Sequence, residues 1–115
     1  MKPFQDAQVI AEAANEKKAR EIIVMDMQEL TPIVDFHIIC DAANKKQIQA
    51  IADNIADKMT EAGNAPLRTE GYREGRWILL DFGSCVAHVF HSDDRQFYDI
   101  EGLWNDAKIE RISAK

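Results

Sequence analysis

The sequence is poor in cysteine, glycine and proline and lacks any long apolar run. Its 115 residues include 2 cysteines, 5 glycines and 3 prolines. So few cysteines exclude a disulfide framework, and Cys40 and Cys85 lie in apolar runs typical of buried, reduced thiols. No stretch approaches the roughly 18 uninterrupted apolar residues of a membrane span, and residues 1–15 lack the apolar core of a signal peptide. We therefore expect a soluble, cytoplasmic protein with no membrane contact.

Basic residues are also in deficit. Lys and Arg number 14 against 20 Asp and Glu, for a formal net charge of −6. A protein that grips phosphate backbones through counterion release needs the opposite sign. Little direct nucleic-acid contact is expected, and a basic protein surface is the better candidate partner.

What the chain does have is enough apolar material for one core. Hydrophobic residues make up 46% of the sequence, which is sufficient for a single modest domain without metals or disulfides. There is no internal repeat, low-complexity tract or linker. We predict one domain over residues 1–115, in which 106–115 form a weakly ordered tail.

Apolar residues recur at helical spacing in three segments. The spacing predicts helices over residues 4–19 and 45–62, the second closed by Gly63 as a left-handed cap. A last helix is predicted after Ser92, with an apolar stripe of four side chains. These are Phe97, Ile100, Leu103 and Trp104.

Short runs rich in β-branched and aromatic residues predict five strands between and after the first two helices. They cover residues 21–27, 35–40, 67–70, 76–82 and 85–91. The order implies a strand-helix-strand crossover with at least two parallel strands. The fold class is therefore α/β, with helices packed on a mixed sheet of about five strands.

Two kinds of chemical site compete with ordinary packing as explanations of the polar residues. His88 and His91 are spaced for metal binding, but residues three apart on a strand point to opposite faces. His37 lies two residues beyond Asp35, which could give it a carboxylate neighbour, and we expect ordinary half-buried histidines rather than a metal site. The strand carboxylates Asp26, Asp35 and Asp81 could serve a metal-dependent nucleotidyltransferase. That enzyme is the alternative function, although the chain has no glycine-rich phosphate loop and neither Ser84 nor Cys85 lies in a nucleophile motif.

The strand at 76–82 gives the most informative pattern. Alternation places Trp77, Leu79 and Asp81 on one face and Ile78, Leu80 and Phe82 on the core face. A tryptophan and an aliphatic residue beside charge are typical of a protein-binding hot spot. The alternative, which spacing leaves equally open, is that a helix covers this face.

These segments together resemble the ribosomal silencing factor family, also called the Iojap family. The resemblance spans residues 18–104 and depends on several motifs in combination. They are KAREIIVMDM, LTPIVDFHIIC, QIQAIADNIADKM, AGNAPLRTEGYREGRWILLDFG, VAHVF and RQFYDIEGLW.

The resemblance implies a domain with the shape of a nucleotidyltransferase that binds a partner without catalysis or a cofactor. It implies docking on the fourteenth protein of the large ribosomal subunit, where bulk blocks joining of the small subunit and represses translation. On this basis Trp77 and Leu79 are expected to supply apolar contact, with carboxylates meeting basic partner residues and Tyr72 as a lesser contact. The carboxylates are those of Asp35, Glu70 and Asp81. A third hypothesis is a homodimer that pairs through the Trp77 face when the partner is absent.

Overall fold

The computed structural model describes residues 3–95 and 108–112. Two helices and six strands form within these residues. In chain order they are α1 (Pro3–Glu16), β1 (Arg20–Asp26), β2 (Phe36–Ala42), α2 (Lys45–Glu61), β3 (Arg68–Glu70), β4 (Trp77–Asp81), β5 (Cys85–His91) and β6 (Lys108–Ile112). The five predicted strands and the first two helices are confirmed to within three residues at each end, which is the usual precision of element boundaries.

Helix α2 begins and ends where its sequence dictates. The Asn44 side chain accepts a hydrogen bond from the backbone N–H of Gln47 at 2.9 Å, which satisfies one of the unpaired donors of the first turn. Gly63 follows the helix with φ +89°, a conformation that other residues rarely adopt. The apolar stripe of the helix is buried, as its spacing predicts. It comprises Ile48, Ile51, Ala52, Ile55 and Met59.

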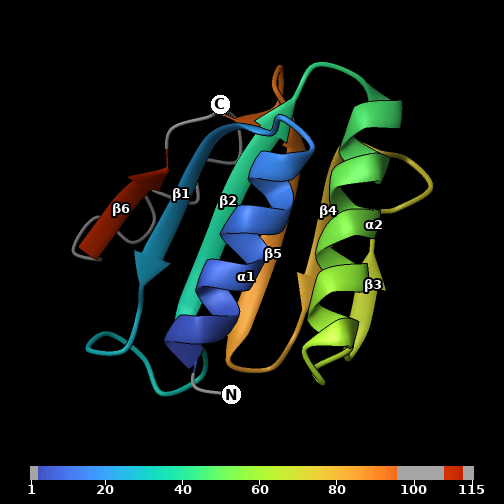
Figure 1. Cartoon of the computed structure of the whole chain (residues 1–115). Helices are drawn as coiled ribbons and strands as arrows, with labels where there is room; N and C mark the ends of the chain where they lie inside the picture. The colour runs from blue at the N-terminus through green and yellow to red at the C-terminus, as the bar shows by residue number, and fades with distance from the viewer. Residues whose placement is uncertain (1–2, 96–107, 113–115) are drawn as a thin grey trace.

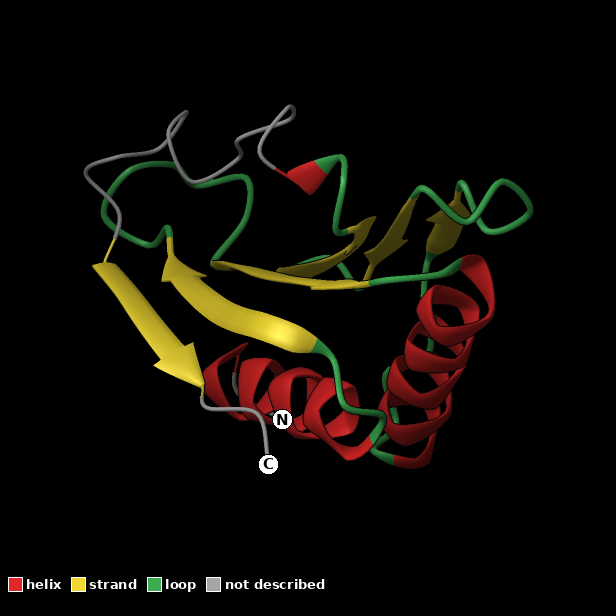
Figure 2. Ribbon diagram, turned by 90° about the horizontal axis from the view of Figure 1, so that it is seen from above, coloured by secondary structure: helices red, strands yellow, loops and turns green. Residues whose placement is uncertain are grey.

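The described strands make one mixed sheet in the order β3-β4-β5-β2-β1-β6. Strands β2 and β5 are parallel, and the other neighbouring pairs are antiparallel. Both helices cover the same face of this sheet, as Figures 1 and 2 show. The α/β class and the mixed sheet are thus confirmed, and we call the face away from the helices the second face.

Strand β6 is a sixth strand, where the sequence predicts about five. It lies within the predicted tail, residues 106–115, and pairs with β1 across five residues of antiparallel ladder. The charged sequence KIERI does not by itself predict a strand. The strand forms because the edge of β1 provides partners for its backbone hydrogen bonds. Most of the helix predicted after Ser92 lies outside the described residues.

The core has two parts, one on each face of the sheet. Between the sheet and the helices, apolar side chains from α1, α2 and β1, β2, β4 and β5 form a large buried cluster. The second face carries a smaller buried cluster, against which Trp77 and Val86 pack. Its buried members are Ile23, Met25, Met27, Val34, Ile39 and Phe90.

A buried ion pair closes the end of β2. Arg95 lies 3.0 Å from the Asp41 carboxylate, and its guanidinium also donates to the backbone carbonyl of Glu21 at 2.6 Å. Glu21 has φ 47°, and the ladder between β1 and β2 shifts register beside it. The arginine therefore satisfies a carbonyl that the bulge removes from the sheet.

Candidate protein-binding site

Strand β4 divides its side chains between the core and a surface. Ile78 and Leu80 are buried on the helix side, whereas Trp77, Leu79 and Asp81 are each half-buried on the second face. Neither described helix covers these three residues. The sequence leaves open whether this face is exposed or covered. The structure shows both, because the second face is buried over β1 and β2 but accessible along β4.

Trp77 is held in place by two neighbours from β5. Its ring stacks on Phe90 with centroids 5.1 Å apart and planes at 28°. Its indole Nε1–H donates to Nδ1 of His88 at 3.1 Å. Both contacts fix the ring while leaving part of it accessible.

The hydrogen bond from Trp77 continues into a histidine pair. Nε2 of His88 lies 3.0 Å from Nδ1 of His37 on β2. Because Nδ1 of His88 accepts from the indole, a neutral His88 carries its proton on Nε2 and donates it to His37. Burial, reinforced by His37, lowers the pKa of His88 to about 3, and burial also lowers the pKa of His37. Both rings are therefore neutral at pH 7.

Sequence reasoning misses this pair because spacing along the chain compares His88 with His91. In the parallel ladder His88 lies opposite Ile39, and His37 is two residues before Ile39 on the same face. His91 instead lies 3.7 Å from the Asp93 carboxylate. Only the register of strands 51 residues apart brings His37 and His88 together.

A groove of about 450 Å³ runs beside β4 on the second face. Apolar side chains dominate its surface, and Ile33 and Leu67 stand beside it with 86% and 72% of their areas exposed. The groove is lined by Thr31, Ile33, Val34, His37, Leu67, Arg68, Leu79, Asp81, Gly83, Val86 and His88. A concave surface with large exposed apolar residues beside it is a candidate site for a protein partner.

Ile33 and Leu67 are members of this site that sequence reasoning does not find. Ile33 lies in a loop, and Leu67 lies one residue before β3 although the sequence predicts a strand from residue 67, so alternation does not separate buried from exposed positions there. The one available signal is that each is a large aliphatic residue next to a proline, Pro32 or Pro66, in a segment that turns.

The carboxylates of the site already have an intramolecular cation. Arg68 lies 3.1 Å from Glu70 and 3.3 Å from Asp81, and Asp81 Oδ1 also accepts from the backbone N–H of Gly83 at 2.8 Å. Asp35 lies at the same end of the sheet, since its backbone N–H donates to the carbonyl of Ser84. The structure thus places Asp35 and Asp81 near one turn.

Tyr72 does not join this group. Its hydroxyl donates to Asp53 of α2 at 3.0 Å, and its carbonyl accepts from Gln49 of the same helix. The hydrogen bond to Asp53 raises the pKa of the Tyr72 hydroxyl. Tyr72 therefore lies toward the helix side, apart from the Trp77 surface.

Two of the carboxylates considered for a nucleotidyltransferase have intramolecular partners. Asp26 accepts from the backbone N–H of Gln28, and Asp81 is paired with Arg68. Among the described residues no three His, Cys, Asp or Glu side chains converge as a metal site. Burial raises the pKa of both Cys40 and Cys85 to about 12, so these thiols are protonated at pH 7.

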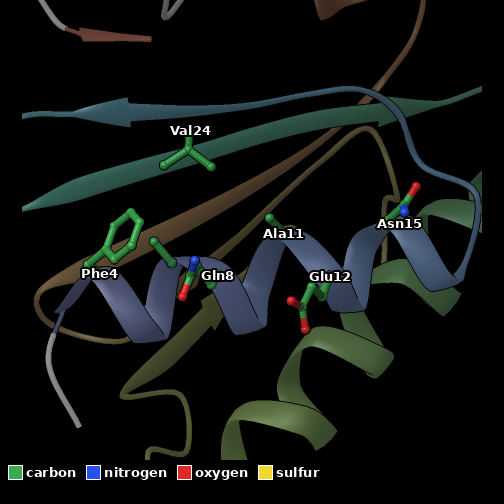
Figure 3. Close-up of a pocket in the computed structure, with 7 residues that line it drawn as sticks. Phe4, Gln8, Ala11, Glu12, Asn15 and Val24 are labelled. Atoms are coloured by element: carbon green, nitrogen blue, oxygen red, sulfur yellow. The ribbon is translucent and has the colours of Figure 1, made fainter. Parts of the chain in front are cut away.

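A second, smaller hollow of about 220 Å³ lies between α1 and β1 (Figure 3). Phe4 and Ala11 come from α1, and Val24 comes from β1. Glu12 is the one titratable side chain among its described lining residues. The hollow therefore lacks converging polar groups that would orient a ligand.

Comparison with known proteins assigns the chain to a family. A model described as "Ribosomal silencing factor during starvation" matches residues 2–115. Ribosomal silencing factor RsfS of Bacillus subtilis is 41% identical over 101 residues, covering 88% of this chain and 86% of the relative. The chloroplastic protein Iojap of Zea mays is 34% identical over 98 residues, covering 85% and 42%.

Two solved structures have the same fold as this chain. One from Chromobacterium violaceum has a TM-score of 0.89 at 31% identity and covers 99% of this chain and 96% of its own. Another, from Bacillus halodurans, has a TM-score of 0.78 at 36% identity, with coverages of 92% and 94%. Among the described helices, none has the length and apolar character needed to cross a bilayer. The Bacillus subtilis relative carries the name of a silencing factor, which is a regulatory role. By the family model and this identity, the chain belongs to the ribosomal silencing factor family.

Proposed function

We propose that the chain binds the large ribosomal subunit in the cytoplasm and sterically blocks joining of the small subunit. Its membership of the silencing factor family supports a ribosomal partner. Blocking of this kind needs affinity and bulk, with no bond made or broken. It therefore agrees with a site built from apolar and paired side chains rather than from activated nucleophiles.

The observation that carries the proposal is the accessible half of the second face. Trp77 is fixed by Phe90 and His88 yet remains only half-buried, and Leu79 of the same strand lines the groove beside exposed Leu67. A rigid aromatic anchor beside a concave apolar surface is what a protein partner would bury. We assign the primary contact to Trp77, Leu79 and the groove.

The partner that fits best is a basic protein of the large subunit, and the family resemblance points to the fourteenth. Arg68 holds Glu70 and Asp81 in place as a fixed charge pattern rather than as free anions. Basic side chains of the partner would share the carboxylates of Glu70 and Asp81 with Arg68. Asp35 makes no ion pair with the described residues and would meet a basic partner residue directly. Net charge of −6 would assist the encounter.

Sedimentation of purified subunits tests the proposal. Small and large subunits are mixed at a magnesium concentration that favours joining, with and without saturating protein. The expected result is a decrease in joined ribosomes and co-sedimentation of the protein with large subunits. Unchanged joining at saturation would contradict the proposal, and Asp57→Asn, on the exposed side of α2, serves as a matched variant that should act like the wild type.

A further inference from the structure

The lysine and arginine side chains of residues 3–95 fall into two groups. One group makes ion pairs with described acids: Arg20, Lys58, Arg68, Arg76 and Arg95. The other group is exposed and makes no ion pair within the described part of the chain: Lys17, Lys18, Lys45, Lys46 and Arg73. The cations of the first group are used in ion pairs within the fold, whereas those of the second group are available to bind a partner.

The available cations lie at one end of the molecule. Lys17 and Lys18 follow α1, and the side chain of Gln47 in the first turn of α2 donates to their carbonyls at 3.4 and 3.3 Å. Lys45 and Lys46 begin α2 itself. The loop after α1 and the start of α2 are thus in direct contact, at the upper end of the view in Figure 1.

Arg73 is carried to the same end by the turn between β3 and β4. That turn packs on α2, because a Cβ placed on Gly75 would lie 2.5 Å from Cγ of Lys45. The carbonyl of Tyr72 accepts from Gln49 at 2.8 Å. We call the five residues Lys17, Lys18, Lys45, Lys46 and Arg73 the basic end.

The positive charges of the basic end are unfavourable for the stability of the segments that carry them. A helix N-terminus favours anions, yet the first turn of α2 holds no acid and begins with two lysines. Lys18 also adopts φ 61°, which is strained for a residue with a side chain. Residues that oppose the local rules without a compensating ion pair in the fold are expected at functional surfaces.

Neighbouring acids offset only part of the charge of the basic end. Glu16 accepts a hydrogen bond from Asn54 and Asp53 accepts one from Tyr72, and neither makes an ion pair with a cation of the basic end. Glu74 lies beside Arg73 in the sequence. The cations outnumber these acids, and the positive potential of the helix N-terminus adds to theirs.

We propose that the basic end is a second contact surface, which binds phosphate groups of ribosomal RNA while the second face binds a protein. This rests on the proposed function and extends it. Lysine is a compact point charge suited to backbone phosphates without sequence preference. The expectation of little nucleic-acid contact followed from a net charge averaged over the whole chain, and that average conceals a local excess at one end.

The two surfaces are separate. The groove lies toward the turn between β4 and β5, which contains Gly83, whereas the basic end surrounds the start of α2 at the opposite end of the sheet (Figure 1). An acidic chain that meets RNA through one positive end only would bind in a single orientation. The RNA contact would therefore set orientation as well as affinity.

Salt dependence of binding tests this proposal. The variant Lys45→Gln with Lys46→Gln removes two charges without removing an ion pair, and relief of the helix N-terminus should leave its stability equal or higher. The control is Lys58→Gln, in the last turn of the same helix, which removes one charge and an exposed ion pair with Glu61 away from the basic end. Affinity for purified large subunits is measured from low to moderate potassium chloride, and affinity for the isolated fourteenth ribosomal protein is measured without RNA.

The double variant should bind large subunits less tightly at low salt than the wild type and the control do. Its slope of log affinity against log salt should fall by about 0.7–0.9 for each phosphate that the variant no longer neutralises. It should bind the isolated protein like the wild type. An unchanged slope on subunits, or an equal weakening on the isolated protein, would overturn the RNA contact alone. Failure of the wild type to bind subunits at all would overturn the proposed function as well.

Discussion

The two faces of the sheet differ in what covers them. Toward α1 and α2, apolar side chains from four strands are fully enclosed, and Ile78 and Leu80 of β4 belong to that core. On the second face the same strand presents Trp77 and Leu79, which stay half-buried beside a groove. Strand β4 thus contributes both to the core and to the accessible surface. Because side chains alternate between the two faces of a strand, every second residue faces the core.

The second face also contains polar groups that the helix side of β4 lacks. Trp77, His88 and His37 form a hydrogen-bonded chain beneath the accessible surface. Such a chain fixes one arrangement of side chains, since each donor needs its particular acceptor. We therefore expect substitutions on the helix side to act on stability and those on the second face to act mainly on binding.

The largest effect is expected from Ile51→Ala on α2. Ile51 is fully buried between the helix and the sheet, so its truncation should lower the free energy of unfolding by roughly 2–5 kcal/mol. Leu79→Ala, on the half-buried side of β4, should lower it by only about 1 kcal/mol. Urea denaturation followed by circular dichroism measures both, and equal decreases would remove the distinction between the faces.

Trp77→Ala should weaken binding to large subunits by about 2 kcal/mol or more, because it removes a fixed aromatic anchor. Unfolding should also become easier, since the Phe90 stack and the His88 hydrogen bond disappear. Trp77→Phe separates these effects by retaining an aromatic ring without the N–H donor. Co-sedimentation reports binding, and a Trp77→Ala protein that stays folded and binds like the wild type would refute the contact.

Asp81→Asn should have a smaller effect on association. The amide oxygen retains the cap on the Gly83 N–H, while the charge shared with Arg68 is removed. Association with large subunits should slow and depend less on salt, because a steering charge is gone. Stopped-flow rates across a salt series measure this, with Asp57→Asn as the control; identical behaviour of the two variants would argue against a role for Asp81.

The effect that is smallest at pH 7 is that of His88 protonation, because it appears only as the pH falls. Burial lowers the pKa of His88 from the usual 6.5 to about 3, so the unfolded chain binds a proton more readily than the folded one. His88 therefore destabilises the fold progressively as pH falls from about 6.5 toward 3, and has no such effect above 6.5. In His88→Phe the free energy of unfolding should fall less over this range, and an unchanged pH profile would contradict the neutral, buried state.

Much of the fold follows from local pattern. The stripe and caps of α2 predict both of its ends, and alternation along β4 correctly separates Ile78 and Leu80 from Trp77 and Leu79. These predictions succeed because period and burial are coupled within one element. Burial of Cys40 and Cys85 as free thiols is predicted from their apolar surroundings and is confirmed.

The features that the sequence could not supply depend on pairing between distant segments. Strand β6 forms along the edge of β1, and nothing in Lys108–Ile112 itself signals that edge. The contact of His37 with His88 follows from parallel register, and the pairing of Arg68 with Asp81 follows from their opposition in the β3-β4 ladder. Each of these requires the sheet order first.

Protection of an introduced thiol would show whether the ribosome covers the groove beside β4. Cys40 and Cys85 are buried with raised pKa, so a single cysteine introduced by Leu67→Cys beside the groove would be the reactive thiol, with Asp57→Cys on α2 as the control. Alkylation of each variant is timed with and without saturating large subunits. We expect strong slowing at position 67 and little change at position 57; equal rates at position 67 with and without bound subunits would contradict binding through the second face.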